Sequence, residues 1–226
     1  MIATGIVLAS ASPRRRRLID WLGVDARTLA TNTAEDLAQP LSPPELATSL
    51  ATAKAIAART TGVHGTILAF DTIVVHGGTV LGKPADANDA RRMLRGLSGG
   101  VHEVITGVAI QGEGMEHPRT FPVATPVHMR TLDTAGIEEW IAGGEALGCA
   151  GAYNIEHHLA SVEDDQCFQN VAGLPLCHVY CALASGLTEH APEGLLCPVD
   201  ACNAALGRHC LLGPVLCAGV GAPARD

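Results

Sequence analysis

Two serines and two arginines stand close together near the N-terminus, in the stretch SASPRRRRL. The cluster consists of Ser10, Ser12, Arg14 and Arg15. Arginine binds phosphate oxygens through two parallel N–H donors, and serine hydroxyls add short donors. Ser12 followed by Pro13 is typical of a helix start, where backbone N–H groups and the helix dipole attract anions. The cluster favours a phosphate-binding site, although a capped surface helix with solvated arginines would contain the same residues.

An aspartate and a lysine add to this chemistry further along the chain. Asp71 interrupts the apolar run AFDTIVV, and Lys83 follows a glycine in LGKP. A carboxylate inside an apolar strand is costly unless it is paired, binds a metal or takes part in catalysis. Asp71 is therefore a candidate general base or metal ligand, with a strand-end aspartate bonded to a turn as the alternative. Lys83 offers a compact positive charge for phosphate, but on its own it would be an ordinary surface lysine.

The basic run is a local feature of an acidic chain. The net charge is −8 and aromatic residues make up 3%, which disfavours binding to nucleic acid or to an anionic membrane. Four consecutive helical positions point in different directions. With Arg14 and Arg15 assigned to phosphate, we expect Arg16 and Arg17 at the surface or in ion pairs.

These side chains must be positioned by strands and helices whose patterns are visible in the sequence. Apolar runs predict strands at residues 5–10, 103–111 and 121–131, and a hairpin across residues 66–84 that turns at Gly77 and Gly78. Caps and propensities predict helices at residues 13–23, 45–59, 86–100 and 134–144, the last of these begun by Thr134, and a final helix after Pro175. Because hairpins and crossovers are both present, the sequence predicts an α/β fold with a sheet of mixed direction, flanked by helices.

Composition indicates a globular protein with an atypical tail. Hydrophobic residues make up 47% of the 226 residues, and no apolar run is long enough to span a membrane. The first 148 residues contain no cysteine, and four of the eight cysteines lie beyond residue 190. This distribution argues against a disulfide scaffold, and with no export signal visible it predicts a cytoplasmic protein. From residue 188 the composition shifts to Gly, Pro and Cys, so we expect a main domain at residues 1–187 and an extension at 188–226.

Three stretches resemble, in order and spacing, the signature blocks of the Maf family of nucleoside triphosphate pyrophosphatases. They are LASASPRRRRLIDWLG, the block that runs from AFDTIVV to ITGVAI, and GCAGAYNIE followed by NVAGLPL. The resemblance implies hydrolysis of a nucleoside triphosphate between its α- and β-phosphates, giving a monophosphate and pyrophosphate with the help of Mg²⁺ or Mn²⁺. It also implies a twisted mixed sheet with two lobes around a central cleft, as in Maf and ITPase proteins, and a homodimer.

The resemblance further assigns roles to individual residues. Asp71 would be the base that activates water, and Glu35, in NTAED, would help Asp71 to hold the metal. The phosphate-binding residues would be Ser10, Arg14, Arg15, Lys54 and Lys83.

Three positions track base specificity in this family, and here they are Arg14, Thr72 and Glu156. The first two resemble the branch that hydrolyses dTTP and UTP, which has glutamine at the third; the branch that acts on 7-methyl-GTP has glutamate there. An ionised carboxylate only accepts hydrogen bonds, whereas glutamine also donates. We expect dTTP, UTP or a modified pyrimidine nucleotide as substrate. The neighbouring His157 and His158 would be exposed or would touch substrate or metal.

An alternative function is a nucleotide-binding regulator of cell division with weak or no catalysis. The altered block around Glu156 and the unfamiliar tail favour this alternative. The tail offers soft metal ligands but no paired C-x-x-C motif, so zinc or an iron–sulfur cluster competes with simple packing of thiols. The residues concerned are Cys197, Cys202, His209, Cys210 and Cys217.

Overall fold

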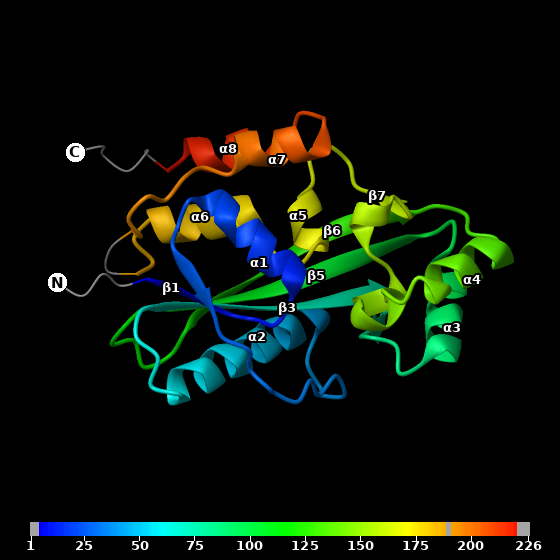
Figure 1. The fold of residues 1–226 in the computed structure, drawn as a ribbon, viewed down its shortest axis with the longest axis horizontal. Coiled ribbons are helices and arrows are strands. Elements are labelled where there is room, and N and C mark those ends of the chain that lie inside the picture. The colour runs from blue at the N-terminus through cyan, green and yellow to red at the C-terminus, as the bar shows by residue number, and fades with distance from the viewer. Residues whose placement is uncertain (1–4, 189–190, 221–226) are drawn as a thin grey trace.

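The computed structural model describes residues 5–188 and 191–220, and its centre is a mixed β-sheet (Figure 1). The strands of this described part are β1 (Ile6–Ala9), β2 (Ala26–Thr28), β3 (Thr66–His76), β4 (Thr79–Leu81), β5 (Val101–Gln111), β6 (Arg119–Met129) and β7 (Ala160–Ser161). They form one sheet in the order β2-β1-β3-β5-β6-β7, with β4 paired to β3. β1 runs parallel to β2 and β3, and the other pairs are antiparallel. The predicted mixed sheet is confirmed.

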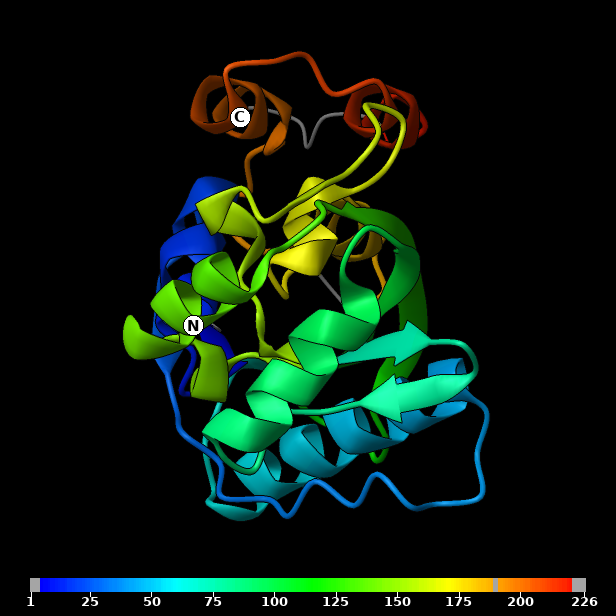
Figure 2. The same cartoon turned by 90° about the vertical axis from the view of Figure 1, so that its right-hand side faces the viewer.

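Helices cover both faces of this sheet. They are α1 (Pro13–Ile19), α2 (Pro43–Thr60), α3 (Ala87–Leu97), α4 (Thr134–Ala142), α5 (Phe168–Val171), α6 (Leu176–Ala184), α7 (Val199–Leu206) and α8 (Leu212–Ala218). Figure 1 shows α2 on one side of the sheet and α1 and α6 on the other. Figure 2 shows the tail helices α7 and α8 as the outermost layer, far from α2.

Most of the predicted helices and strands are present, with three differences. The helix predicted to begin at Thr134 is capped by Asp133, whose side chain accepts a hydrogen bond from the Gly136 N–H. The helix after Pro175 is not the last one, because α7 and α8 follow it. The sequence patterns also missed the helix α5 and the strands β2 and β7, which have only four, three and two residues.

Alternation along the strands divides the apolar side chains between the two faces of the sheet. Ile6 and Leu8 of β1 belong to the large core on the α1 and α6 side. Val7 and Ala9 point the opposite way, as period-two geometry requires, and pack with alanines of α2. Small side chains let α2 approach the sheet closely, so its residues come near the middle of β3.

The C-terminal segment packs against the rest of the fold. The Leu196 N–H donates to the Leu22 carbonyl at 2.8 Å, and Arg208 pairs with Asp164 at 2.7 Å. Cys202 of α7 is buried within the large core.

None of the helices in the described ranges combines the length and apolar character needed to cross a membrane.

The close approach of α2 to β5 predicts a strong effect of one substitution. A Cβ added at Gly107 would lie 2.1 Å from the Ala47 carbonyl oxygen, so Gly107→Ala must push α2 away from the sheet. We expect the free energy of unfolding to fall by about 1–3 kcal/mol, measured by urea denaturation. Gly96→Ala in α3 is the control: an added Cβ there meets no atom within 4 Å. Equal stability of the Gly107→Ala variant and the wild type would contradict this account of the packing.

Candidate functional site

A cavity of about 790 Å³ lies between the segment after β1, the middle of β3 and residues 144–157. All nine residues to which the family resemblance gives a role line it, although they come from separate parts of the chain. They are Ser10, Arg14, Arg15, Glu35, Lys54, Asp71, Thr72, Lys83 and Glu156. The structure thus brings the predicted residues together, and their individual roles stay predictions.

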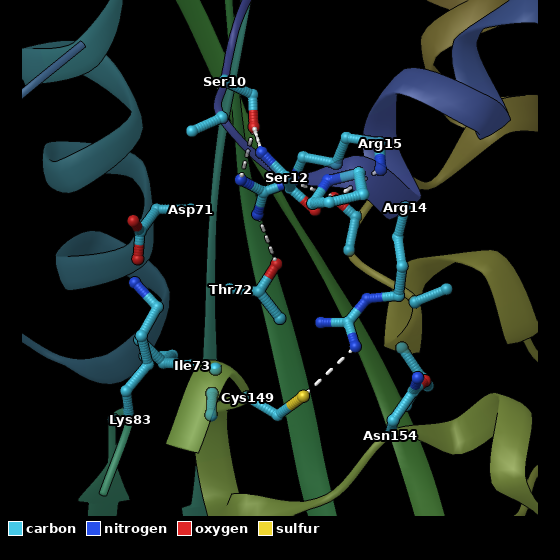
Figure 3. Close-up of a pocket in the computed structure, with 18 of the residues that line it drawn as sticks. Ser10, Ser12, Arg14, Arg15, Asp71, Thr72, Ile73, Lys83, Cys149 and Asn154 are labelled. Atoms are coloured by element: carbon cyan, nitrogen blue, oxygen red, sulfur yellow. Dashed lines mark hydrogen bonds between the residues drawn. The ribbon is translucent and has the colours of Figure 1, made fainter. Parts of the chain in front are cut away.

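Arg15 is held in place by the protein on several sides (Figure 3). Its Nε donates to the Gly173 carbonyl at 2.8 Å, its Nη2 to Thr72 Oγ1 at 2.9 Å and its Nη1 to Ser10 Oγ at 3.4 Å. Desolvation by burial lowers the pKa of Arg15 to about 10, an effect that the nearby Asp71 carboxylate opposes. Arg15 is therefore cationic at neutral pH and fixed in orientation.

Thr72 links Arg15 to the interior. Thr106 Oγ1 donates to the Asn170 carbonyl at 3.1 Å, which uses its single hydrogen. Thr72 Oγ1 must then donate to Thr106 Oγ1 at 2.9 Å, and it accepts from Arg15. The single hydrogen of the Thr72 hydroxyl is thus directed at Thr106, and its oxygen accepts from the Arg15 guanidinium.

Two carboxylates and two lysines form a chain of opposite charges on the other side of the cavity. Lys54 Nζ contacts Asp71 Oδ1 and lies 2.9 Å from Glu35 Oε1. Lys83 Nζ lies 3.1 Å from both oxygens of Glu35, and Figure 3 shows the Lys83 side chain extending toward Asp71. The cations are positioned by α2 and by the segment that follows β4.

The two carboxyl groups have opposite pKa shifts. Asp71 is 4% exposed, and burial raises its pKa although Lys54 and Arg15 act against the shift. Burial would also raise the pKa of Glu35, but the hydrogen bonds and charges of Lys54 and Lys83 outweigh it, so that pKa is lowered. Two acids whose environments separate their pKa values are suited to different roles, a base and a fixed anion.

Glu35 and Asp71 suit a divalent cation only in combination with other ligands. Among residues 5–188 and 191–220, no three His, Cys, Asp or Glu side chains are arranged to hold a metal ion. Mg²⁺ commonly takes one or two carboxylates and completes its shell with water and phosphate oxygens. Glu35 and Asp71 both contact the Lys54 ammonium, so they are close enough to supply carboxylate oxygens to an ion that replaces this ammonium between them.

The zinc hypothesis for the tail finds no support in the part of the tail that the structure describes. Within residues 191–220, no three Cys, His, Asp or Glu side chains are arranged to hold a metal ion. Cys202 is buried in the core, whereas Cys197 is exposed. The eight cysteines are free thiols.

The far end of the cavity contains residues that sequence reasoning did not select. Arg14 Nη1 donates to Cys149 Sγ at 3.2 Å (Figure 3). Asn154 is buried, and its Nδ2 donates to Glu145 Oε2 at 3.1 Å. Cys149 and Asn154 lie within the signature block GCAGAYNIE, but nothing in the sequence gives either of them, or Glu145, a place in the site. Their contacts are visible only in the fold.

Arg17 pairs with Glu156 across this end of the cavity. The expectation of a surface or ion-pair position for Arg17 is confirmed, but the residue also lines the cavity. His157, predicted to be exposed or near substrate, is exposed, lines the cavity and lies 3.3 Å from Glu145.

The fold and the site together define an α/β protein whose cavity places fixed cations opposite a buried acid. The sequence model of the Maf-like protein family matches residues 5–186, and the chain belongs to this family. A dTTP/UTP pyrophosphatase of Syntrophomonas wolfei is 43% identical over 78% of this chain and 95% of its own length. A dTTP/UTP pyrophosphatase of Geobacter sulfurreducens is 42% identical over 77% of this chain and 92% of its own. Among solved structures, the Staphylococcus aureus Ham1 protein has a TM-score of 0.40 and 14% identity, covering 55% of this chain and 71% of that one, a similarity that bears on neither substrate nor mechanism.

The Arg15–Thr72 contact predicts that Thr72→Val is destabilising. Valine has nearly the same shape as threonine, but it cannot accept a hydrogen bond from the guanidinium. We expect the free energy of unfolding to fall by about 1–3 kcal/mol, the usual cost of an unpaired polar group, measured by chemical denaturation. Thr72→Ser keeps the hydroxyl and should retain most of the stability. A Val variant as stable as the wild type would show that Thr72 does not hold Arg15.

Proposed function

We propose that this protein hydrolyses nucleoside triphosphates between the α- and β-phosphates, giving a nucleoside monophosphate and pyrophosphate, and that it prefers dTTP and UTP. The observation that carries the proposal is the placement of Arg14, Arg15, Lys54 and Lys83 around the buried Asp71 in one cavity. Membership of the Maf family supports the reaction, and the two dTTP/UTP pyrophosphatases that are 43% and 42% identical support the pyrimidine preference.

The arginines and lysines of the cavity can neutralise the negative charge of the triphosphate. A triphosphate is strongly negative, and attack by water is slow until that charge is neutralised. Arg14 and Arg15 from α1 and Lys83 from beyond β4 line the cavity on different sides, so a polyphosphate chain can lie between them. Because Arg15 is already held by Gly173, Thr72 and Ser10, little reorganisation is needed when substrate binds.

Asp71 is the residue best suited to accept the proton of the attacking water. Its raised pKa makes it a stronger base than an exposed aspartate, and its burial keeps it in a fixed place. Glu35, with its lowered pKa, stays ionised and holds Lys54 and Lys83 in position.

Glu35 and Asp71 would hold the Mg²⁺ or Mn²⁺ that the family resemblance implies. When bound, such an ion supplies positive charge that polarises phosphoryl oxygens.

We also propose that residues 1–187 form the catalytic domain and residues 188–226 an extension, and that the protein acts as a homodimer in the cytoplasm. The charge balance and the low aromatic content support a small-molecule substrate rather than nucleic acid or membrane.

The proposal predicts pyrophosphate release from UTP and dTTP in the presence of Mg²⁺ or Mn²⁺. Asp71→Asn removes the base while keeping the shape, so kcat should fall by about 10²–10⁴-fold, the usual contribution of general base catalysis. Asp25→Asn, at an exposed position outside the cavity, is the matched control. Saturable nucleotide binding without pyrophosphate release from any triphosphate would favour the regulator hypothesis instead.

The contact between Lys54 and Asp71 predicts a shift in the pH dependence. Lys54 lowers the pKa of Asp71, so Lys54→Met should raise that pKa further. A base works only when deprotonated, so the rise of kcat/KM on the acidic side of its pH profile should move to higher pH. The shift is measured after each variant's profile has been normalised to its plateau. Lys83→Met is the control, since Lys83 pairs with Glu35. If the acidic side of the pH profile is the same in the wild type and in Lys54→Met, or lies at lower pH in the variant, the role of Asp71 is contradicted.

A further inference from the structure

The end of the cavity remote from Asp71 is formed by α1 and by the helical turn Ile155–His157. Arg14 and Arg17 stand three residues apart on α1, so they project from the same face, separated by about 4.5 Å along the axis. Arg14 contacts Cys149, and Arg17 pairs with Glu156. A nucleotide whose phosphates lie at Arg14 and Arg15 would extend its base toward Arg17.

The Arg17–Glu156 pair is accessible and incompletely used by the protein. The side chain of Arg17 is 55% exposed and that of Glu156 is 29% exposed. The pair is joined by Arg17 Nη2 and Glu156 Oε1, and in the described part of the chain these two side chains make no other hydrogen bond. Guanidinium N–H donors and a carboxylate oxygen therefore remain for a ligand.

We propose that Arg17 is a further specificity-determining residue, which acts with Glu156 to recognise the edge of a uracil or thymine base, an inference that rests on the proposed function. The guanidinium would donate to a base carbonyl oxygen and the carboxylate would accept from the adjacent N3–H. Cytosine presents the reverse order, with an amino donor next to an N3 acceptor. Because the ion pair holds a donor and an acceptor side by side, it would bind uracil or thymine in preference to cytosine.

Arg17 has a second effect, which is electrostatic. An unpaired carboxylate beside a polyphosphate would repel the substrate, and the repulsion would be strong in a partly desolvated cavity. Pairing with Arg17 neutralises Glu156 while leaving it able to accept a hydrogen bond. Arg17 is thus the residue that allows a glutamate at this position to read a base.

The test measures equilibrium affinities for UMP, CMP and pyrophosphate by calorimetry. We expect the wild type to bind UMP more tightly than CMP. Arg17→Ala should weaken UMP binding about tenfold, the effect expected of one charge-assisted hydrogen bond, and should bring the UMP-to-CMP ratio toward one. Pyrophosphate affinity should stay nearly unchanged. Arg16→Ala, an exposed neighbour on the same helix, is the matched control and should leave the ratio as in the wild type.

A double variant separates recognition from a structural role. Arg17→Ala leaves Glu156 as a lone carboxylate, whereas Arg17→Ala with Glu156→Gln has an amide that both donates and accepts. The double variant should recover part of the lost UMP affinity. An equal loss of UMP, CMP and pyrophosphate binding in Arg17→Ala, or no loss of UMP binding, would overturn the inference.

The outcome is independent of catalysis because the monophosphates are not hydrolysed. Absence of pyrophosphate release from UTP would defeat the proposed function. An unchanged UMP-to-CMP affinity ratio in Arg17→Ala would defeat the base-recognition role of Arg17.

Discussion

The site depends on one costly arrangement, the burial of the Asp71 carboxylate in the middle of a central strand. An ionised carboxylate is unfavourable there unless cations come close to it. Lys54 contacts it from α2, and Arg15 approaches it from α1 on the other side of the sheet. For Lys54 to reach Asp71, α2 must pack tightly against β3 and β5. The alanine-rich face of α2 and the missing side chain at Gly107 meet this requirement directly.

Charges in the cavity are organised so that each group fixes another. Glu35 holds Lys54 and Lys83, while Thr72 and Gly173 hold Arg15. The resulting cations are oriented before any ligand arrives, which is the condition for strong electrostatic stabilisation of charge during a reaction. The opposite pKa shifts of Asp71 and Glu35 follow from the same geometry, since one is buried and the other stands between two ammonium groups.

Sequence patterns were sufficient for the main elements and for the side chains that the fold brings into one cavity. The apolar run of β1, the Ser12 cap and the carboxylate inside AFDTIVV are local signals. They predicted the first strand and the first helix, and they singled out Asp71, whose role stays a prediction. Contacts between distant residues leave no such signal. Arg17 and Glu156 are 139 positions apart, and the engagement of Thr72 with Arg15 depends on the register of β3 beside β5. The short strand β2 and the helices α7 and α8 have patterns too brief, or too rich in Gly, Pro and Cys, to be distinguished from loops.

The most direct test of the account is a crystal structure of the protein with a UTP analogue whose α,β-bridge cannot be hydrolysed. The account predicts that the phosphate chain contacts Arg14, Arg15 and Lys83, with the α-phosphorus reached from Asp71 through a single water. A triphosphate bound outside this cavity, or Asp71 screened from the phosphates by the protein, would contradict it.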